Sequence, residues 1–425
     1  MTDDLIKKIA AEVNVALAKE SQKILAQMTL TEREKIITNI RSMTHENAKT
    51  FAQMAVEETG MGNVEHKILK HQLVADKTPG TEDITAKAWS GTSGLTMVEM
   101  MPFGVIGAIT PSTNPSETVI CNTIGMLAGG STVVFSPHPG AMKTSLAAID
   151  MVNRASAAAG GPAKIAFHAS TEVLLQHKDI SLLVATGGPG LVAACLKSGK
   201  RAIGAGAGNP PVLVDDTADI KKAAEDIING CSFDNNLPCI AEKAIVAMSA
   251  IADKLMDSMI NEQACYRATV AEVVKLQALV LTPKLNRDCV GKSADVLLEM
   301  AGISAPKGKR CIIFEGEKEH PLIAEELMMP IIGVVRARSF EDALEKALWL
   351  EHGYGHSAHI HSKDIARLSL YERVMGTAIL VKNAPSYAAL GFGSEGYCTF
   401  TIASRTGEGL TSAASFTRQR RHVMV

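Results

Sequence analysis

The sequence predicts an α/β protein built of two lobes. The chain has 425 residues, which is too many for one hydrophobic core of ordinary size. From residue 95 onward, short apolar segments rich in Val, Ile and Ala alternate with helical segments. Strands of that composition, without polar alternation, are typical of a parallel sheet covered by helices on both faces. Ligands of such sheets bind beyond the carboxyl ends of the strands.

The first sixty residues are expected to be helical. Leu5, Ile6, Ile9 and Val13 fall at helical spacing, and residues 30–43 repeat the pattern after a break. We expect the N-terminal helix to pack against the first lobe. A docking peptide for a partner surface is the alternative, but no Gly/Pro/Ser-rich linker sets this segment apart from the chain that follows.

The alternating segments divide into two series and a tail. Helices at residues 116–128 and 144–159 lie between the first three strands of the first series, whose expected strands span residues 105–110, 132–136, 164–168, 182–186 and 201–205. The strands expected in the second series span residues 211–215, 244–248, 310–314, 331–336 and 378–382, and a further strand at 416–425 ends the chain. We therefore expect domains at residues 1–211 and 212–398, followed by a tail at 399–425.

Composition excludes several classes of function. Hydrophobic residues make up 46% and charged residues 21% of the chain, which is a globular rather than a disordered profile. Because the net charge is −2 and no basic stretch is interleaved with aromatics, we expect no nucleic acid partner. The one basic cluster, Arg418, Arg420 and Arg421, is expected to be an exposed strand face.

Membrane and metal functions are not expected either. No apolar run approaches the roughly 20 residues of a membrane span, and no secretory apolar region opens the chain. The eight cysteines have no metal-ligand spacing, which indicates reduced thiols and no metal site. These features favour a cytoplasmic protein.

One cysteine stands in a context that suits a nucleophile. The polar run at residues 232–238, ending in proline, precedes Cys239 between an expected helix and an expected strand. The thiolate is the nucleophilic form of cysteine, and nearby amide donors can lower its pKa. The alternative is a loop cysteine without a role, which the segment by itself favours. The other seven cysteines are expected to be core or loop residues.

Three further segments can contact a ligand, although each also has an ordinary structural explanation. Asn114 follows the strand at residues 105–110 and can donate its amide to a developing oxyanion, or simply cap the next helix. The Gly-rich turns at residues 186–190 and 204–211 let the backbone approach a pyrophosphate. Neither turn is a GxGxxG fingerprint, so ordinary turn chemistry remains the alternative for both.

Seven segments in order along the chain resemble the CoA-acylating aldehyde dehydrogenases, and among them the acetaldehyde and propionaldehyde dehydrogenases of bacterial microcompartments. They span residues 102–107, 111–115, 135–139, 204–211, 234–243, 326–330 and 406–409. The resemblance implies an aldehyde dehydrogenase-like fold with two Rossmann-like lobes and a small oligomerisation strand element. It assigns NAD and CoA binding to residues 1–211 and catalysis to residues 212–398. The tail and about residues 89–101 would form the oligomerisation element.

The resemblance also implies roles for matching residues. Cys239 matches the nucleophile, Asn114 the side-chain member of the oxyanion hole, and His356 a histidine near the active site. Because His359 and His361 are close by, the alternative is that these histidines are simply solvated. Residues expected at the cofactor are Thr110, Pro111, Ser112, Ser136, Pro137, His138, Thr186, Gly187, Gly188, Gly206, Glu326 and Met328, with Glu326 at the nicotinamide ribose.

Two departures from the hydrolytic branch of that superfamily predict the acyl acceptor. Where hydrolytic enzymes carry a glutamate base in a Glu-Leu-Gly-Gly-Lys segment, residues 204–208 here are Gly-Ala-Gly-Ala-Gly. Losing a general base costs water activation typically ~10²–10⁴-fold, whereas the thiolate of CoA needs less assistance. Ser136 replaces the usual ribose-binding lysine, which opens the adenosine pocket to NAD and CoA in turn.

We therefore expect an enzyme that converts a short aldehyde, CoA and NAD⁺ to acyl-CoA and NADH through a Cys239 thioester. Acetaldehyde or propionaldehyde is the expected substrate, and NADP is an alternative cofactor. A CoA-dependent succinate semialdehyde dehydrogenase, a phosphorylating semialdehyde dehydrogenase and an inactive assembly relative are the alternatives. The resemblance implies a homodimer or homotetramer joined through the terminal strand. Microcompartment association stays open, because no N-terminal packaging extension is evident.

Overall fold

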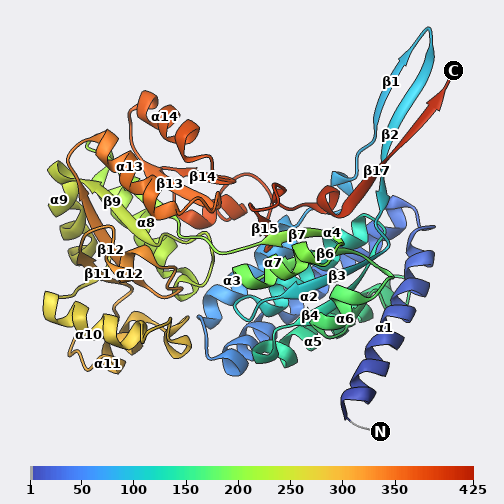
Figure 1. The fold of residues 1–425 in the computed structure, drawn as a ribbon, viewed down its shortest axis with the longest axis horizontal. Coiled ribbons are helices and arrows are strands. Elements are labelled where there is room, and N and C mark those ends of the chain that lie inside the picture. Colours follow the sequence, from blue (N-terminus) through green and yellow to red (C-terminus); the bar gives the residue numbers. More distant parts are fainter. Residues whose placement is uncertain (1–2) are drawn as a thin grey trace. The chain divides into compact units, whose positions relative to one another are not determined.

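The computed structural model describes residues 3–425, with side chains from Lys8 onward (Figure 1). The chain divides into two compact units. The first comprises Met1–Thr59, Lys67–Gly206 and Gly396–Val425, and the second comprises Gly60–His66 and Ala207–Glu395. In the described part of the chain, no helix is long and apolar enough to cross a membrane. The division of cofactor binding and catalysis between the units stays a prediction.

The first unit contains a five-stranded parallel sheet. Its strands are β3 (Val105–Thr110), β4 (Thr132–Pro137), β5 (Ala166–His168), β6 (Ile180–Thr186) and β7 (Arg201–Ala205), which confirms the five expected strands. The order across the sheet is β5-β4-β3-β6-β7. The chain therefore starts at the centre, adds two strands on one side and then two on the other. The strand order reverses between β3 and β6, where sheets of this type bind their ligands.

The first unit also contains a series of helices, and the first of them lie within the first sixty residues, as the sequence predicts. Their bounds are α1 (Asp3–Leu25), α2 (Leu30–Thr59), α3 (Val64–Lys77), α4 (Pro115–Ala128), α5 (Met142–Ala158), α6 (Thr171–Gln176) and α7 (Pro189–Lys197). Every residue of α4, the helix that follows the central strand β3, is buried.

Helix α1 packs on the sheet as expected, but through a different face. Ala11, Val15 and Ala18 are buried in a cluster that includes residues of β3, β4 and β5, whereas Ile9 and Val13 are about half exposed. The side chains of Leu5 and Ile6 lie outside the described residues. Small side chains let the α1 backbone lie close to the sheet, and the Thr132 hydroxyl donates to the Ala18 carbonyl at 2.9 Å. Close backbone approach, rather than the largest apolar residues, decides which face is buried.

The second unit contains a seven-stranded parallel sheet in the order β10-β11-β12-β9-β8-β13-β14. The strands are β8 (Pro211–Val214), β9 (Ala244–Met248), β10 (Tyr266–Arg267), β11 (Ile312–Glu315), β12 (Ile331–Ala337), β13 (Ser357–His361) and β14 (Ile379–Lys382). The helices are α8 (Ile220–Ser232), α9 (Ser249–Asn261), α10 (Val270–Val280), α11 (Ala294–Met300), α12 (Pro321–Ala324), α13 (Phe340–Glu351) and α14 (Ile365–Met375). The five strands expected in this series are confirmed.

Two strands of this sheet were not expected. Strand β10 has only two residues, too few for a pattern. Strand β13 alternates polar and apolar residues, yet all of it is buried. The alternative that His359 and His361 are solvated is therefore wrong, since their exposed fractions are 0% and 2%. Burial lowers the pKa of His359 to about 4 and that of His361 to about 3, so both are neutral in this core.

A three-stranded antiparallel sheet carries the end of the chain. It consists of β1 (Lys87–Gly91), β2 (Gly94–Pro102) and β17 (Thr417–Met424), which lie side by side in Figure 1. The register pairs Thr417 with Pro102 and Met424 with Leu95. The basic cluster of β17 is exposed, as expected, and Arg420 forms an ion pair with Glu99 on β2. A short pair, β15 (Ile402–Ala403) and β16 (Gly409–Leu410), precedes β17.

Candidate functional site

The residues expected at the cofactor in the first unit gather at one edge of its sheet. Thr110 ends β3, Pro137 ends β4 and Thr186 ends β6, while Gly206 follows β7. In a parallel sheet these carboxyl ends share an edge, so the fold brings the segments together around the point where strand order reverses. The neighbouring candidates at the same edge are Pro111, Ser112, Ser136, His138, Gly187 and Gly188.

The hydroxyl side chains at this edge differ in whether they have a hydrogen-bond partner. The Thr110 hydroxyl is buried and has no hydrogen-bond partner among the described residues. The Thr186 hydroxyl lies 3.2 Å from that of Thr401, and the Ser136 hydroxyl lies 2.8 Å from that of Thr171. Buried polar groups normally have a hydrogen-bond partner, so the Thr110 hydroxyl is suited to bind a polar group of a ligand at this edge of the sheet.

Gly188 and His138, at the same edge, both stand at the N-terminus of a helix. Gly188 is the N-cap of α7, and no atom lies within 4 Å of the place where a Cβ would stand. The helix N-terminus is therefore approachable, and its amide groups favour negative charge. His138 caps the short helix Pro139–Ala141 by accepting from the Gly140 amide at 3.1 Å.

Asn114 lies between β3 and α4, but its side chain does not cap the helix. Its backbone carbonyl accepts from the Thr118 amide at 3.1 Å and from the Thr118 hydroxyl at 2.6 Å. The side-chain oxygen instead accepts a hydrogen bond from the Lys70 ammonium. Capping by the Asn114 side chain, the ordinary explanation for this residue, is therefore wrong.

In the second unit, Cys239 follows a turn of unusual backbone conformation. Asp234, Asn235 and Asn236 have φ angles of 48°, 54° and 65°. Each non-glycine residue in this left-handed region costs of the order of 1 kcal/mol or more, so three in succession require support from neighbouring groups. Cys239 is partly exposed, whereas the other seven cysteines are buried, as expected.

Hydrogen bonds from three directions hold the turn. The Asp234 carboxylate accepts from the Asn63 amide at 2.7 Å, and the Asn235 side chain donates to the Gly291 carbonyl at 2.8 Å. The Asn236 side chain donates to the Cys231 carbonyl at 2.9 Å. These hydrogen bonds hold the polar run before Cys239 in one conformation and so fix the position of the thiol.

A buried lysine that the sequence did not single out completes this support. The Lys243 ammonium donates to the Asn236 carbonyl at 2.9 Å, to the Asn236 side-chain oxygen at 2.5 Å and to the Pro238 carbonyl at 3.4 Å. Its residue is only 4% exposed. The signal in the sequence is a charged residue directly before the wholly apolar strand β9. Lys243 thus fixes the turn and places a positive charge close to Cys239.

The candidates of the second unit meet at the amino edge of its sheet. Cys239 precedes β9, Glu326 and Met328 precede β12, Gly208 precedes β8, and His356 precedes β13. These strands are neighbours in the order β12-β9-β8-β13, so the segments that enter them lie side by side.

Gly208 links two of these candidates through its backbone. Its backbone amide lowers the pKa of the Glu326 carboxyl group, and a Cβ at Gly208 would lie 2.8 Å from Cγ of His356. A larger residue at position 208 would therefore displace the His356 ring.

His356 is neutral and partly unsatisfied. Its Nδ1 lies 2.7 Å from the Ser357 hydroxyl, while its buried Nε2 has no hydrogen-bond partner among the described residues. Burial, together with the positive charge of Lys243, lowers the pKa of His356 to about 4. At neutral pH the ring can accept a hydrogen bond but carries no charge.

The electrostatics around Cys239 keep the resting thiol protonated. Burial raises the pKa of the Cys239 thiol to about 12; Glu326 also raises it, whereas Lys243 and the backbone amides of Cys239 and Ile240 lower it. Burial raises the pKa of Glu326 to about 7, against the opposing effect of Lys243 and the Gly208 amide. Burial lowers the pKa of Lys243, which Glu326 opposes. Glu326 is thus a nearby charge that titrates close to neutrality.

The substitution Glu326→Gln is expected to speed alkylation of Cys239 by iodoacetamide at pH 8, by a few-fold or more. Removing the carboxylate removes a charge that disfavours the thiolate, so the pKa of Cys239 falls. The measurement is the pH dependence of alkylation, read by mass spectrometry of the Cys239 peptide. The matched control is Glu325→Gln, which removes the neighbouring carboxylate. A slower reaction of the Glu326→Gln variant would contradict this expectation and indicate that Glu326 accepts the thiol proton.

A second buried carboxyl lies behind the turn. Glu242 is fully buried, its Oε1 accepts from the Ser386 amide at 2.8 Å, and its Oε2 has no partner among the described residues. A Cβ at Gly230 would lie 2.1 Å from that Oε2, so only glycine fits there. Burial raises the pKa of Glu242 from 4.5 to about 8, although the Ser386 hydrogen bonds oppose it.

Glu242 is therefore expected to make the folded protein less stable as the pH rises. A carboxyl whose pKa is raised by folding contributes stability that is complete below about pH 4.5 and is lost as the pH passes about 8. Glu242→Gln keeps a neutral group at all pH values, so the melting temperature of the variant should fall less between pH 5 and pH 9. Each unit of pKa difference corresponds to about 1.4 kcal/mol, so the effect should reach a few kcal/mol. Parallel melting curves for both proteins would contradict it.

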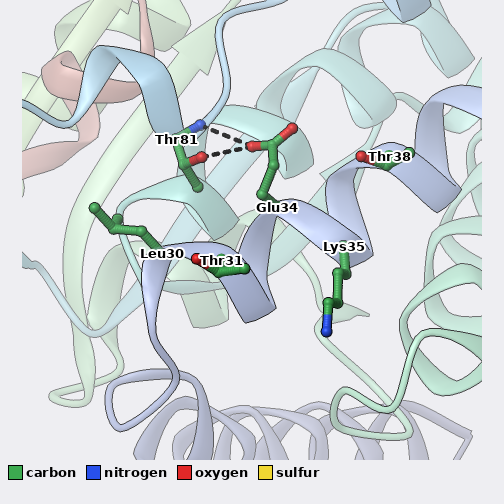
Figure 2. Close-up of a pocket in the computed structure, with 6 residues that line it drawn as sticks. All are labelled: Leu30, Thr31, Glu34, Lys35, Thr38 and Thr81. Atoms are coloured by element: carbon green, nitrogen blue, oxygen red, sulfur yellow. Dashed lines mark hydrogen bonds between the residues drawn. The ribbon is translucent and has the colours of Figure 1, made fainter.

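One surface hollow of the first unit lies apart from these candidates (Figure 2). It is lined by Leu30, Thr31, Glu34, Lys35, Thr38 and Thr81. The Glu34 carboxylate accepts from the Thr81 hydroxyl at 2.6 Å and from the Thr81 amide at 3.2 Å, as Figure 2 shows. The Glu34 carboxylate is already hydrogen-bonded to the segment after α3. We therefore assign the hollow no part in the candidate site.

Known proteins resemble this chain over nearly its whole length. The propanal dehydrogenase (CoA-propanoylating) of Citrobacter freundii is 46% identical over 406 residues, which are 94% of this chain and 88% of that protein. A propionaldehyde dehydrogenase from the Clostridium phytofermentans fucose utilisation bacterial microcompartment superposes with a TM-score of 0.96 and 67% identity, covering 96% of each chain.

A third relative was solved with ligands. The Rhodopseudomonas palustris propionaldehyde dehydrogenase with bound CoA and an acylated cysteine has a TM-score of 0.95 and 48% identity, covering 98% of this chain and 97% of that one. Residues 5–393 match the aldehyde dehydrogenase family as a whole. The expected fold is thereby confirmed, and the chain belongs to the aldehyde dehydrogenase family.

Proposed function

We propose that this protein is a CoA-acylating aldehyde dehydrogenase that oxidises acetaldehyde or propionaldehyde with NAD⁺ and transfers the acyl group to CoA. The observation that carries the proposal is Cys239, a partly exposed thiol on a braced turn at a sheet edge that it shares with Gly208, Glu326 and His356. The relatives named for CoA-propanoylating activity and for bound CoA support the choice of acceptor.

In the first half of the reaction, the partly exposed Cys239 thiol gives its proton to solvent water, and its sulfur attacks the aldehyde carbon to form a thiohemiacetal. The resemblance assigns two donors to the oxygen that becomes negative, the backbone amide of Cys239 and the side-chain amide of Asn114. A nicotinamide cofactor, when bound, supplies the hydride acceptor. Thr186, Gly187 and Gly188 would hold its pyrophosphate and Glu326 its ribose, with NADP as the alternative to NAD.

In the second half, CoA cleaves the thioester on Cys239. Its sulfur attacks the acyl carbon, the bond to Cys239 breaks, and the cysteine leaves as a thiolate that is protonated again. His356 can accept a hydrogen bond from the incoming thiol, because its Nε2 is unsatisfied within the described residues. Residues 204–208 are Gly-Ala-Gly-Ala-Gly where hydrolytic relatives carry a glutamate base in a Glu-Leu-Gly-Gly-Lys segment, so water has no base here and the thioester persists until CoA arrives.

The test is NADH formation from acetaldehyde and propionaldehyde with CoA, with phosphate, or with neither. We expect steady turnover only with CoA, acyl-CoA as the product, and rates at least ~10²-fold lower without it. Equal rates without CoA would indicate a hydrolytic enzyme, and turnover with phosphate a phosphorylating one. Higher kcat/KM for succinate semialdehyde would favour that alternative substrate. Absence of any turnover or burst would favour an assembly protein.

The proposal extends to assembly. The exposed strand β17 would pair with a second copy, giving a homodimer or homotetramer, and the microcompartment origin of one relative supports encapsulation. Native mass measured by light scattering tests the first point: a monomeric mass would contradict it. Recovery of the protein with purified compartment shells tests the second.

A further inference from the structure

We infer that Lys70 is a positioning residue for the oxyanion donor: its buried ammonium holds the Asn114 amide in the one orientation that presents its N–H groups, and strengthens them as donors. The inference rests on the proposed function of Asn114. It adds a residue of helix α3 to the machinery, although nothing in the local sequence around Asn114 points to it.

The contacts form a chain of three buried groups. Lys70 and Glu117 are 1% and 0% exposed, and Asn114 is 9% exposed. The Lys70 ammonium donates to the Asn114 side-chain oxygen and lies 3.3 Å from Oε1 of Glu117. Glu117 stands in the first turn of α4, three residues after Asn114. The carboxylate therefore fixes the ammonium, and the ammonium fixes the amide.

The chemistry of lysine decides which way the amide faces. An ammonium can only donate, so the group of Asn114 that faces Lys70 must be the oxygen. The amide nitrogen then points elsewhere, and it makes one long hydrogen bond, at 3.4 Å to the Thr113 hydroxyl. Without the lysine, the amide could rotate and present its oxygen, which would repel a developing negative charge.

The charge of Lys70 also makes the Asn114 amide a stronger hydrogen-bond donor. A cation at the amide oxygen draws electron density from the nitrogen, so its N–H groups become better donors in a low-dielectric site. Burial raises the pKa of the Glu117 carboxyl, but Lys70, His71 and Lys67 outweigh it and lower that pKa to about 2. The carboxylate is thus ionised throughout the working pH range and keeps the pair charged.

Neighbouring groups hold this arrangement in place. The Lys67 ammonium, one turn earlier on α3, donates to the Thr113 carbonyl at 3.0 Å. His71 places Nδ1 2.7 Å from the Lys67 carbonyl, so that nitrogen carries a proton, and its Nε2 lies 2.8 Å from the Ser116 hydroxyl. Residues 113–116 are therefore contacted in succession by one face of α3.

The experiment is a double-mutant cycle, made in the unaltered protein and repeated in a Glu117→Gln background. In that second background, removing the lysine leaves no unpaired buried carboxylate. Lys70→Met is expected to lower kcat for acyl-CoA formation by ~10²-fold or more, as for loss of an oxyanion donor, with a smaller change in KM for the aldehyde. In Asn114→Ala, the same lysine change should lower kcat less than about threefold, because the group that it positions is gone.

Two controls separate positioning from damage to the fold. Lys67→Met removes a buried ammonium of the same helix that donates to the Thr113 backbone carbonyl, and its kcat should fall by less than about tenfold. Alkylation of Cys239 by iodoacetamide needs no oxyanion hole, so its rate should stay within about twofold in Lys70→Met. Lys70→Gln keeps a neutral donor and should recover part of the activity, and it replaces Lys70→Met if that variant does not fold.

The outcomes are distinct. Equal effects of the lysine change with and without the Asn114 side chain would overturn the inference, as would a Lys67→Met loss as large as that of Lys70→Met. If the parent protein made no acyl-CoA, or if Cys239→Ala retained the activity, the proposed function itself would fail, before any lysine variant is compared.

Discussion

Replacing Cys239 by alanine is expected to reduce acyl-CoA formation by at least ~10⁴-fold while leaving the fold intact. The expected loss is large because both halves of the proposed reaction pass through the sulfur, and removing a nucleophile leaves only the contribution of binding and the oxyanion donors. The side chain is small and partly exposed, so its removal should cost little stability.

The matched control is Cys265→Ala. That thiol is 1% exposed in the core of the same unit, so its replacement should lower stability slightly and leave kcat within a few-fold. A second measurement follows the intermediate directly. With aldehyde and NAD⁺ but no CoA, the unaltered protein should release one NADH per site and gain one acyl group on the peptide that contains Cys239. An acyl group on any other peptide, or unchanged turnover of Cys239→Ala, would refute the assignment.

The strands of both sheets were predictable because buried parallel strands appear as uninterrupted apolar runs. Strand β3 occupies the predicted residues, and β9 does as well. Strand β13 escaped prediction because its histidines look like surface residues, although tertiary burial makes them core. Helix α1 was predicted, but its buried face was not, since the choice depends on how closely the backbone approaches the sheet.

The candidate site was predicted from a resemblance that runs over seven segments, and not from any one segment by itself. The local sequence at Cys239 and at Asn114 also fits a loop cysteine and an N-cap. Lys70 is 44 residues from Asn114 in the chain, and only the packing of α3 beside α4 brings them together. Lys243 lies inside one of the segments that carry the resemblance. Its hydrogen bonds to the turn, however, depend on the left-handed backbone at Asn236, and the local sequence does not predict that conformation.

The substitution Asn114→Asp is expected to lower kcat further than Asn114→Ala, by more than ~10³-fold against ~10²–10³-fold. The two side chains have the same shape, and the new carboxylate would face the Lys70 ammonium that now holds the amide oxygen. The fold should therefore be kept, or even gain stability from a charged pair. The amide donor, however, is replaced by an oxygen that carries negative charge.

That substitution separates the donor function of Asn114 from its packing. In the ground state the aldehyde oxygen is neutral, so KM should change little, whereas the transition state places negative charge beside the new carboxylate and kcat should fall. The measurement is kcat and KM for aldehyde with saturating CoA and NAD⁺, alongside melting temperatures of both variants. If Asn114→Asp were more active than Asn114→Ala, the side chain would serve only to fill space beside Lys70, and the oxyanion would have to be stabilised by the Cys239 amide without it.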